Sequence, residues 1–154
     1  MNPAAGQRSH DSVEDNEIVD LERGALDRWG NGDPQGYLEI MAPEVTYFDP
    51  LQPQRVDGLQ AMKDLLEPLT GKIRVDRYDM LSPRVQRHGD AALLTFNLVS
   101  YRKRLDGSEQ PIVQWNSTET YARIDGQWRI VHSHWSYVQP ELKHSMDETS
   151  EEIL

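Results

Sequence analysis

The stretch that decides the fold runs from residue 111 to residue 138 and reads PIVQWNSTETYARIDGQWRIVHSHWSYV. Apolar or aromatic residues alternate with polar ones on both sides of Asp125-Gly126, a spacing typical of strands that bury one face. Asp-Gly accepts the positive φ angles of a two-residue hairpin turn. The sequence therefore predicts a closing antiparallel hairpin with strands at about 111–124 and 127–138.

The chain before this hairpin divides into a helical part and a strand part. Apolar residues recur at helical spacing up to residue 69, which predicts helices at about 16–29, from Pro34 to Met41, and at about 58–69. Alternation from residue 73 predicts further strands at about 73–80, 84–88 and 91–104. Three helices followed by an antiparallel meander predict an α+β fold, with the helices packed on one face of a curved sheet.

Composition excludes several classes of function. The 154 residues contain no cysteine, which excludes thiol catalysis and zinc sites built on thiolates. The formal net charge of −10 disfavours nucleic acid and anionic membranes as partners. With no long apolar run and no secretory leader, the sequence predicts a soluble cytoplasmic protein. We also expect no cofactor and no metal.

Acidic side chains gather at the two ends of the chain. Residues 1–17 carry four acidic side chains and one Arg, and residues 141–154 carry five acidic side chains and one Lys. Both ends lack apolar periodicity, and this lack is typical of mobile tails. We therefore expect a disordered acidic N-terminal tail at 1–15, one folded domain at 16–140 and an acidic C-terminal tail at 141–154.

Several motifs carry a family resemblance. They are Asn31-Gly32-Asp33, Thr46-Tyr47-Phe48-Asp49-Pro50, Val56-Asp57-Gly58-Leu59, Leu81-Ser82-Pro83 and the closing hairpin. Over about 18–138 the chain resembles the association (hub) domain of calcium/calmodulin-dependent protein kinase II. It also resembles the SnoaL-like and ketosteroid-isomerase-like proteins of the nuclear transport factor 2-like fold. The resemblance implies a cone, in which a bent, mainly antiparallel sheet wraps around helices and leaves an internal pocket. No kinase motif is present, so it concerns the hub alone.

The resemblance also places the pocket residues. Kinase hubs line their pocket with three arginines and a histidine, and the matching positions here hold Leu98, Glu119, Trp135 and Met62. Arginines would bind a carboxylate, whereas these side chains predict a small apolar or cationic ligand. The predicted ligand-binding residues are Trp29, Tyr37, Tyr47, Met62, Phe96, Leu98, Trp115, Tyr121 and Trp135.

Two carboxyl groups are candidates for catalysis. Asp49 follows an aromatic pair and Glu119 lies among aromatic residues, and such surroundings raise a carboxyl pKa toward neutrality. Tyr37 or Tyr47 would supply a hydroxyl group. Alternatively, Asp49 is a turn residue, and Glu119 pairs with Arg102 or Arg123 or lies in solvent.

Two functions therefore stay open. The first is a small-molecule-binding, oligomerising domain without kinase activity. The second is a small SnoaL-like isomerase, cyclase or dehydratase, in which Asp49 or Glu119 acts as a general acid or base on an apolar carbonyl substrate.

The last strand suggests how copies of the chain associate. Strict alternation places Trp128, Ile130, His132 and His134 on the outer face of the sheet. An apolar and aromatic outer face predicts a homo-oligomer, at least a dimer, through these four residues. The two histidines are too few for a metal site, so no metal is expected.

Overall fold

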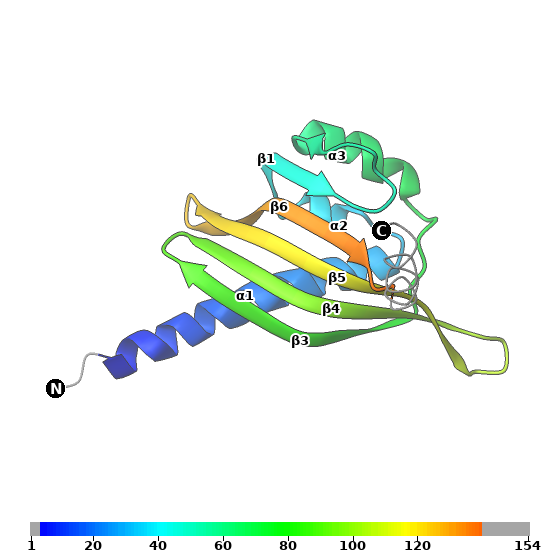
Figure 1. Cartoon of the computed structure of the whole chain (residues 1–154), viewed down its shortest axis with the longest axis horizontal. Coiled ribbons are helices and arrows are strands. Elements are labelled where there is room, and N and C mark those ends of the chain that lie inside the picture. The colour runs from blue at the N-terminus through cyan, green and yellow to red at the C-terminus, as the bar shows by residue number, and fades with distance from the viewer. Residues whose placement is uncertain (1–3, 140–154) are drawn as a thin grey trace, which may run out of the picture.

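A computed structural model of the chain describes the backbone of residues 4–139 and side chains from residue 13 onward. The helices are α1 (Ala4–Gly30), α2 (Gln35–Leu38) and α3 (Leu59–Leu66), followed by a 3-10 turn, η1 (Glu67–Leu69). The strands are β1 (Met41–Phe48), β2 (Val56–Asp57), β3 (Arg77–His88), β4 (Ala91–Lys103), β5 (Glu109–Ile124) and β6 (Gln127–Tyr137). Figure 1 shows the elements in this order along the chain.

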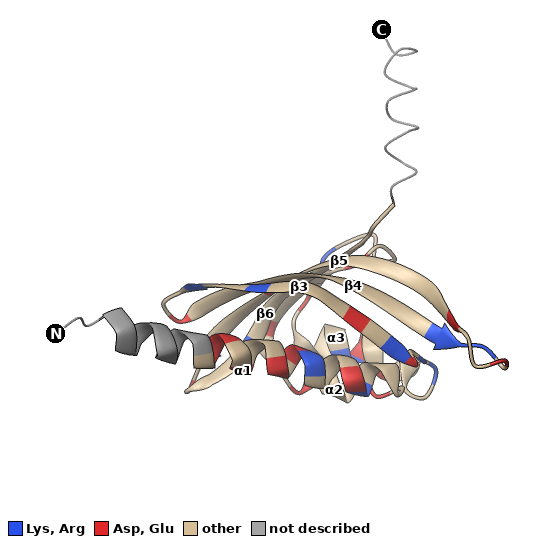
Figure 2. Ribbon diagram, turned by 90° about the horizontal axis from the view of Figure 1, so that it is seen from below, with Lys and Arg blue, Asp and Glu red and all other residues tan. Residues whose placement is uncertain are grey.

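All six strands form one sheet in the order β2-β1-β6-β5-β4-β3. Every neighbouring pair is antiparallel except β1 and β6, which run parallel. The sheet arches over α1 and α2, as Figure 2 shows, so its concave face and the helices enclose the core. The predicted α+β cone with a curved, mainly antiparallel sheet is therefore confirmed. Among the described residues, no helix is both long enough and apolar enough to cross a membrane.

The closing hairpin forms at the predicted turn. Asp125 and Gly126 have φ angles of 52° and 79°, and Ile124 pairs with Gln127 across them. Positive φ at both central residues matches the twist of the flanking strands, which is why Asp-Gly closes hairpins so often. The prediction of paired strands around this turn is confirmed.

Strand β6 contains one extra residue, Val131. Tyr121 pairs with Ile130, but its neighbour Thr120 pairs with His132, so Val131 is skipped in the ladder. Such a bulge exchanges the two faces of a strand, because side chains alternate with a period of two. The residues before Val131 therefore face the opposite way from the prediction.

This bulge corrects the predicted outer face. Trp128 and Ile130 are buried in the core, at 2% and 0% exposure, whereas His132 and His134 remain on the outer face opposite Thr120 and Thr118. The prediction of an association surface that includes all four side chains is therefore wrong for Trp128 and Ile130.

Helix α1 begins at Ala4, well before the predicted start near residue 16. Most of the expected N-terminal tail is therefore helical in the structure. Glu14, inside that expected tail, is buried and forms ion pairs with Arg87 and Arg123. These arginines compensate the carboxylate for its lost hydration. The predicted C-terminal tail at 141–154 lies outside the described residues.

Proline residues explain two smaller differences from the predicted elements. The third helix leaves α geometry for a 3-10 turn that contains Pro68, which has no N–H for a helical hydrogen bond. The two strands expected at about 73–80 and 84–88 form a single strand, β3. Its register shifts between Leu81 and Arg84, across Pro83 and Ser82, whose φ is 50°. Met41 belongs to β1 rather than to the second helix, opposite Ile130.

Candidate binding cavity and buried carboxyl pair

A cavity of about 410 Å³ lies between the sheet and the segments that contain α1, α2 and η1. Aromatic side chains supply much of its wall. They are Trp29, Tyr37, Tyr47, Tyr78, Trp115, Trp135 and Tyr137. Among the described residues that line it, Asp49 is the only one with a charged side chain. The cavity is thus apolar and aromatic, with one carboxylate.

Trp135 holds the aromatic wall together. Its indole meets the rings of Tyr37, Phe96 and Trp115 edge to face, at centroid distances of 6.5, 5.7 and 5.8 Å. Edge-to-face contacts at this range are favourable and fix the ring orientations. Trp29 continues the row by meeting Tyr37 at 6.1 Å. The aromatic side chains of the wall therefore support one another through ring contacts.

Asp49 lies where β1 ends at the cavity. Its Oδ2 accepts a hydrogen bond from the Tyr47 hydroxyl at 2.9 Å, and its Oδ1 accepts bonds from the backbone N–H groups of Leu51 and Gln52 at 2.7 and 3.1 Å. The second pair of bonds is an Asx turn, so Asp49 is both a turn residue and a cavity residue. Burial and Asp49 together raise the pKa of Tyr47 well above its ordinary value.

Glu22 is buried behind the cavity on α1. Its two oxygens accept hydrogen bonds from Tyr37 at 2.8 Å and Tyr121 at 2.6 Å. Burial raises the pKa of Glu22 to about 7, and the two tyrosine bonds only partly offset this effect. A carboxyl with this pKa exchanges its proton near neutral pH.

Glu119 is the second buried carboxyl, on β5. Its Oε1 accepts a bond from Ser133 Oγ at 2.6 Å, and Ser133 Oγ accepts one from Trp135 Nε1 at 2.9 Å. Burial raises the pKa of Glu119 well above its ordinary value and the charge of Glu22 adds to the shift, while Ser133, Trp135 and Ser117 oppose it. Glu22 and Glu119 therefore act on each other inside one water-poor core.

Neither arginine considered as a partner for Glu119 reaches it. Arg123 bonds to Asp90 and Glu14, and Arg102 donates to the backbone carbonyl of Arg74. With Glu119 fully buried, the alternatives of an arginine pair or a solvent position are both excluded by the structure.

The structure separates the predicted site residues into two groups. Trp29, Tyr37, Tyr47, Asp49, Leu98, Trp115 and Trp135 line the cavity. The others lie in the core behind it, where Phe96 supports Trp135 and Tyr121 binds Glu22. This second group is Met62, Phe96, Glu119 and Tyr121. Whether any of them binds a ligand stays a prediction.

Sequence reasoning missed Glu22. The residue lies four positions after Ile18 and four before Leu26, on the stripe of α1 that packs into the core. An acidic residue inside an apolar helical stripe is the signal that could have found it. Tyr78 and Tyr137 were missed as cavity residues as well.

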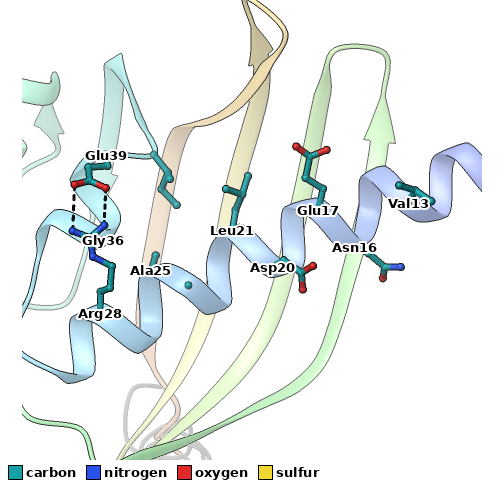
Figure 3. Close-up of a pocket in the computed structure, with 11 residues that line it drawn as sticks. Val13, Asn16, Glu17, Asp20, Leu21, Ala25, Arg28, Gly36 and Glu39 are labelled. Carbon is teal, nitrogen blue, oxygen red and sulfur yellow. Dashed lines mark hydrogen bonds and ion pairs between the residues drawn. The ribbon is translucent and has the colours of Figure 1, made fainter.

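A second, wider hollow follows α1 beside α2 and the residues before β1, with a volume of about 720 Å³ (Figure 3). Val13, Leu21 and Ala25 supply apolar surface in it. Its Arg28 is held by Glu39 through two hydrogen bonds, at 2.6 and 3.2 Å, which the dashed lines in Figure 3 mark. None of the described residues that line this hollow carries a buried carboxyl group, so the aromatic cavity is the stronger candidate site.

With this geometry in view, comparison with known proteins decides the family. Residues 14–139 match the family described as calcium/calmodulin dependent protein kinase II association domain. This chain belongs to that family. The association domain here is 27% identical to the kinase type II subunit delta of Oryctolagus cuniculus over 146 residues. That match covers 88% of this chain and only 27% of the rabbit subunit.

Two solved structures extend the comparison. A candidate ketosteroid isomerase from Parabacteroides distasonis shares 37% identity, with a TM-score of 0.69 over 80% of this chain and 87% of that one. The kinase II hub homology domain of Chlamydomonas reinhardtii shares 25% identity, with a TM-score of 0.66 over 82% and 98% of the two chains. The association domain is thus similar to both kinds of protein named in the sequence analysis.

Proposed function

We propose that this association domain binds a small apolar or cationic molecule in its aromatic cavity and assembles with copies of itself, without kinase activity of its own. The observation that carries the binding proposal is the composition of the cavity wall. Seven aromatic side chains and one carboxylate line it, and no described lining residue is Lys, Arg or His.

The size and chemistry of the cavity support a small ligand. A volume of about 410 Å³ falls in the range of pockets that enclose small molecules, which runs from roughly 300 to 1,000 Å³. Aromatic rings bind apolar groups by contact area and cations by their negative faces. A carboxylate ligand would meet Asp49 with no cation to offset the repulsion.

The self-association proposal rests on the family and on the corrected outer face. Relatives carry the descriptions association domain and hub. On the outer face, Phe48 contacts the rings of His132 and His134 at 5.9 and 5.3 Å, and His132 Nδ1 lies 2.7 Å from Thr46 Oγ1. We therefore assign self-association to the face that carries these residues, and leave Trp128 and Ile130 to the core.

A second candidate function is proton transfer on an apolar carbonyl substrate. Asp49 favours it, because its carboxylate reaches the cavity and lies 2.9 Å from the Tyr47 hydroxyl. A carboxylate beside a tyrosine can remove a proton while the hydroxyl group steadies the resulting enolate. The similarity to a candidate ketosteroid isomerase agrees with this chemistry.

Native mass spectrometry of freshly purified protein tests the two parts of the first proposal together. We expect a mass of at least two subunits and, for copies that retained a ligand, an added mass that disappears on activation in the gas phase. Leu98→Arg, which places a cation in the cavity, should abolish the added mass, while Gln60→Arg on the exposed face of α3 should not. The proposal would be overturned by a monomer that carries no added mass and whose tryptophan fluorescence is quenched by no apolar or cationic probe.

A further inference from the structure

Glu22 and Glu119 are both buried in the core, and among the described residues no cation is paired with either of them. Each is fully buried. The groups bonded to them are hydroxyls, from Tyr37, Tyr121 and Ser133. Two like charges that are both withdrawn from water repel each other strongly, so the two carboxyls together keep at least one proton near neutral pH.

Both carboxyls connect to the wall of the cavity through a single hydroxyl group. Tyr37 lines the cavity, and its hydroxyl donates to Glu22. Ser133 lines the cavity as well, and its hydroxyl donates to Glu119. Ser117 and Trp135 lie close enough to favour the ionised form of Glu119, yet within the described part of the chain no donor reaches its Oε2 in hydrogen-bonding geometry. A charge placed in the cavity therefore acts on the pair across one layer of side chains.

The other ionisable groups around the pair are weak acids. Tyr37 on α2 and Tyr121 on β5 have their pKa values raised well above ordinary by burial and by the two carboxyls. Tyr47 on β1 is raised by burial and by Asp49. Among the described residues of the remaining elements, the hydrophobic core side chains do not ionise; they include Met62 on α3 and Leu94 and Phe96 on β4. At neutral pH, the protons that can move are thus those of Glu22 and Glu119.

Building on the proposed binding function, we propose that the cavity takes an organic ammonium ion, and that its entry releases a proton from the Glu22–Glu119 pair to solvent. The ammonium ion supplies a positive charge to this part of the core. The O–H bond of the protonated carboxyl breaks heterolytically, its electron pair stays on the carboxylate, and the proton leaves for water. This part of the core then contains two carboxylates near one bound cation, instead of one carboxylate and one acid.

The aromatic wall explains the choice of an ammonium ion over a metal ion. An alkylated ammonium group is weakly hydrated, and its charge is attracted to the faces of indole and phenol rings. Within the described residues no group of three His, Asp or Glu side chains is placed to hold a metal ion. Low local polarity strengthens the action of the cation on both carboxyls.

Two probes of the same shape separate charge from fit. Phenyltrimethylammonium carries a permanent positive charge, and tert-butylbenzene is its neutral counterpart. We expect tryptophan fluorescence titration at pH 8 to show that the ammonium probe binds at least tenfold more tightly than tert-butylbenzene. As pH falls below 8 its affinity should decrease by up to about tenfold per pH unit for each proton released, because protons must leave before the cation is accommodated. The affinity of tert-butylbenzene should not depend on pH.

Calorimetry in two buffers counts the proton directly. Titrations of phenyltrimethylammonium in phosphate and in MOPS, two buffers that differ in ionisation enthalpy, should differ in heat by the amount that proton release adds, at pH 6.5 and at pH 7. The double variant Glu22→Gln/Glu119→Gln should release no proton and bind the ammonium probe more weakly. Glu44→Gln, an exposed site, should behave as the parent protein.

The outcomes distinguish this inference from the function on which it rests. Ammonium binding without proton release overturns the inference, and so does equal affinity for the two probes, while the cavity would remain a binding site. If neither probe binds, both the inference and the ligand-binding proposal fail. If the double variant does not fold, the two-buffer measurement on the parent protein still decides.

Discussion

Helix α1 buries two carboxyl groups in opposite surroundings. Glu14 forms ion pairs with Arg87 at 2.6 Å and Arg123 at 3.2 Å, and both guanidinium groups also lie over the ring of Trp128. Glu22, eight residues further along the same helix, bonds to two tyrosine hydroxyls. The first carboxyl has cations to offset its lost hydration, and the second has none.

The difference teaches how one helix face can serve two purposes. An ion pair that is buried with its partners holds the helix to the sheet. A carboxyl that meets only hydroxyls loses hydration without compensation, and the pKa of Glu22 rises to about 7 as a result. The part of α1 around Glu14 therefore anchors the helix to the sheet, and the part around Glu22 is sensitive to charge and pH.

Breaking the anchor should have the largest effect. Arg87→Met leaves Glu14 buried with one fewer cation, so we expect the free energy of unfolding to fall by about 3 kcal/mol in denaturant titrations. The matched control is Arg84→Met, an exposed arginine of the same strand. Adding Glu14→Leu to Arg87→Met should recover at least half of the loss. If Arg87→Met and Arg84→Met lower the free energy of unfolding equally, the result would contradict the role given to this ion pair.

The pH dependence of stability should sharpen the contrast at Glu22. Its folded-state pKa of about 7 lies above the ordinary 4.5, so the group stabilises the fold at low pH and this contribution is lost as pH rises from about 4.5 to 7. We expect Glu22 to account for a loss of between about 2 and 3 kcal/mol across that window. Glu22→Gln should flatten that part of the profile in denaturation series at fixed ionic strength. An unchanged slope would show that Glu22 ionises normally.

The tyrosine bonds to Glu22 should contribute less. Tyr121→Phe removes a donor at 2.6 Å from a buried carboxyl, so we expect a loss of about 1.5 kcal/mol at pH 8, where that carboxyl is ionised. At pH 5 the loss should be smaller. Tyr78→Phe is the comparison, because that hydroxyl bonds to exposed Asp27 at 2.8 Å. If Tyr121→Phe lowers the free energy of unfolding equally at both pH values, the result would argue against an ionised Glu22 as the acceptor at pH 8.

An exposed ion pair at the other end of α1 should show the smallest effect. Arg28 binds Glu39 at the surface, where water and salt screen the charges. We expect Glu39→Gln to leave Tm unchanged within error at 0.15 M salt. A clear drop in Tm would mean that surface pairs along α1 matter as much as the buried pair at Glu14.

The sequence predicted those features that depend on local pattern. The Asp125-Gly126 turn and the strands around it followed from period-two alternation. Five of the seven aromatic residues that line the cavity were among the predicted ligand-binding residues. Leu98 and Trp135 line the cavity as expected. These features are encoded by residues close in sequence, so a single chain reveals them.

Features that depend on distant contacts were missed. The Val131 bulge has no local signature, yet it reverses the faces of Trp128 and Ile130. The buried state of Glu14 depends on arginines in β3 and β5. Glu22 was overlooked because its partners come from α2 and β5, which no helical pattern reveals.

The most direct test of the central claim is a carbon NMR titration of protein labelled at the glutamate side-chain carboxyl carbons. If Glu22 and Glu119 act on each other as a pair, one carboxyl signal should titrate near pH 7 and the other well above the ordinary glutamate range. Both shifted titrations should vanish in Glu22→Gln/Glu119→Gln. Titration of every glutamate below pH 5 would contradict the account.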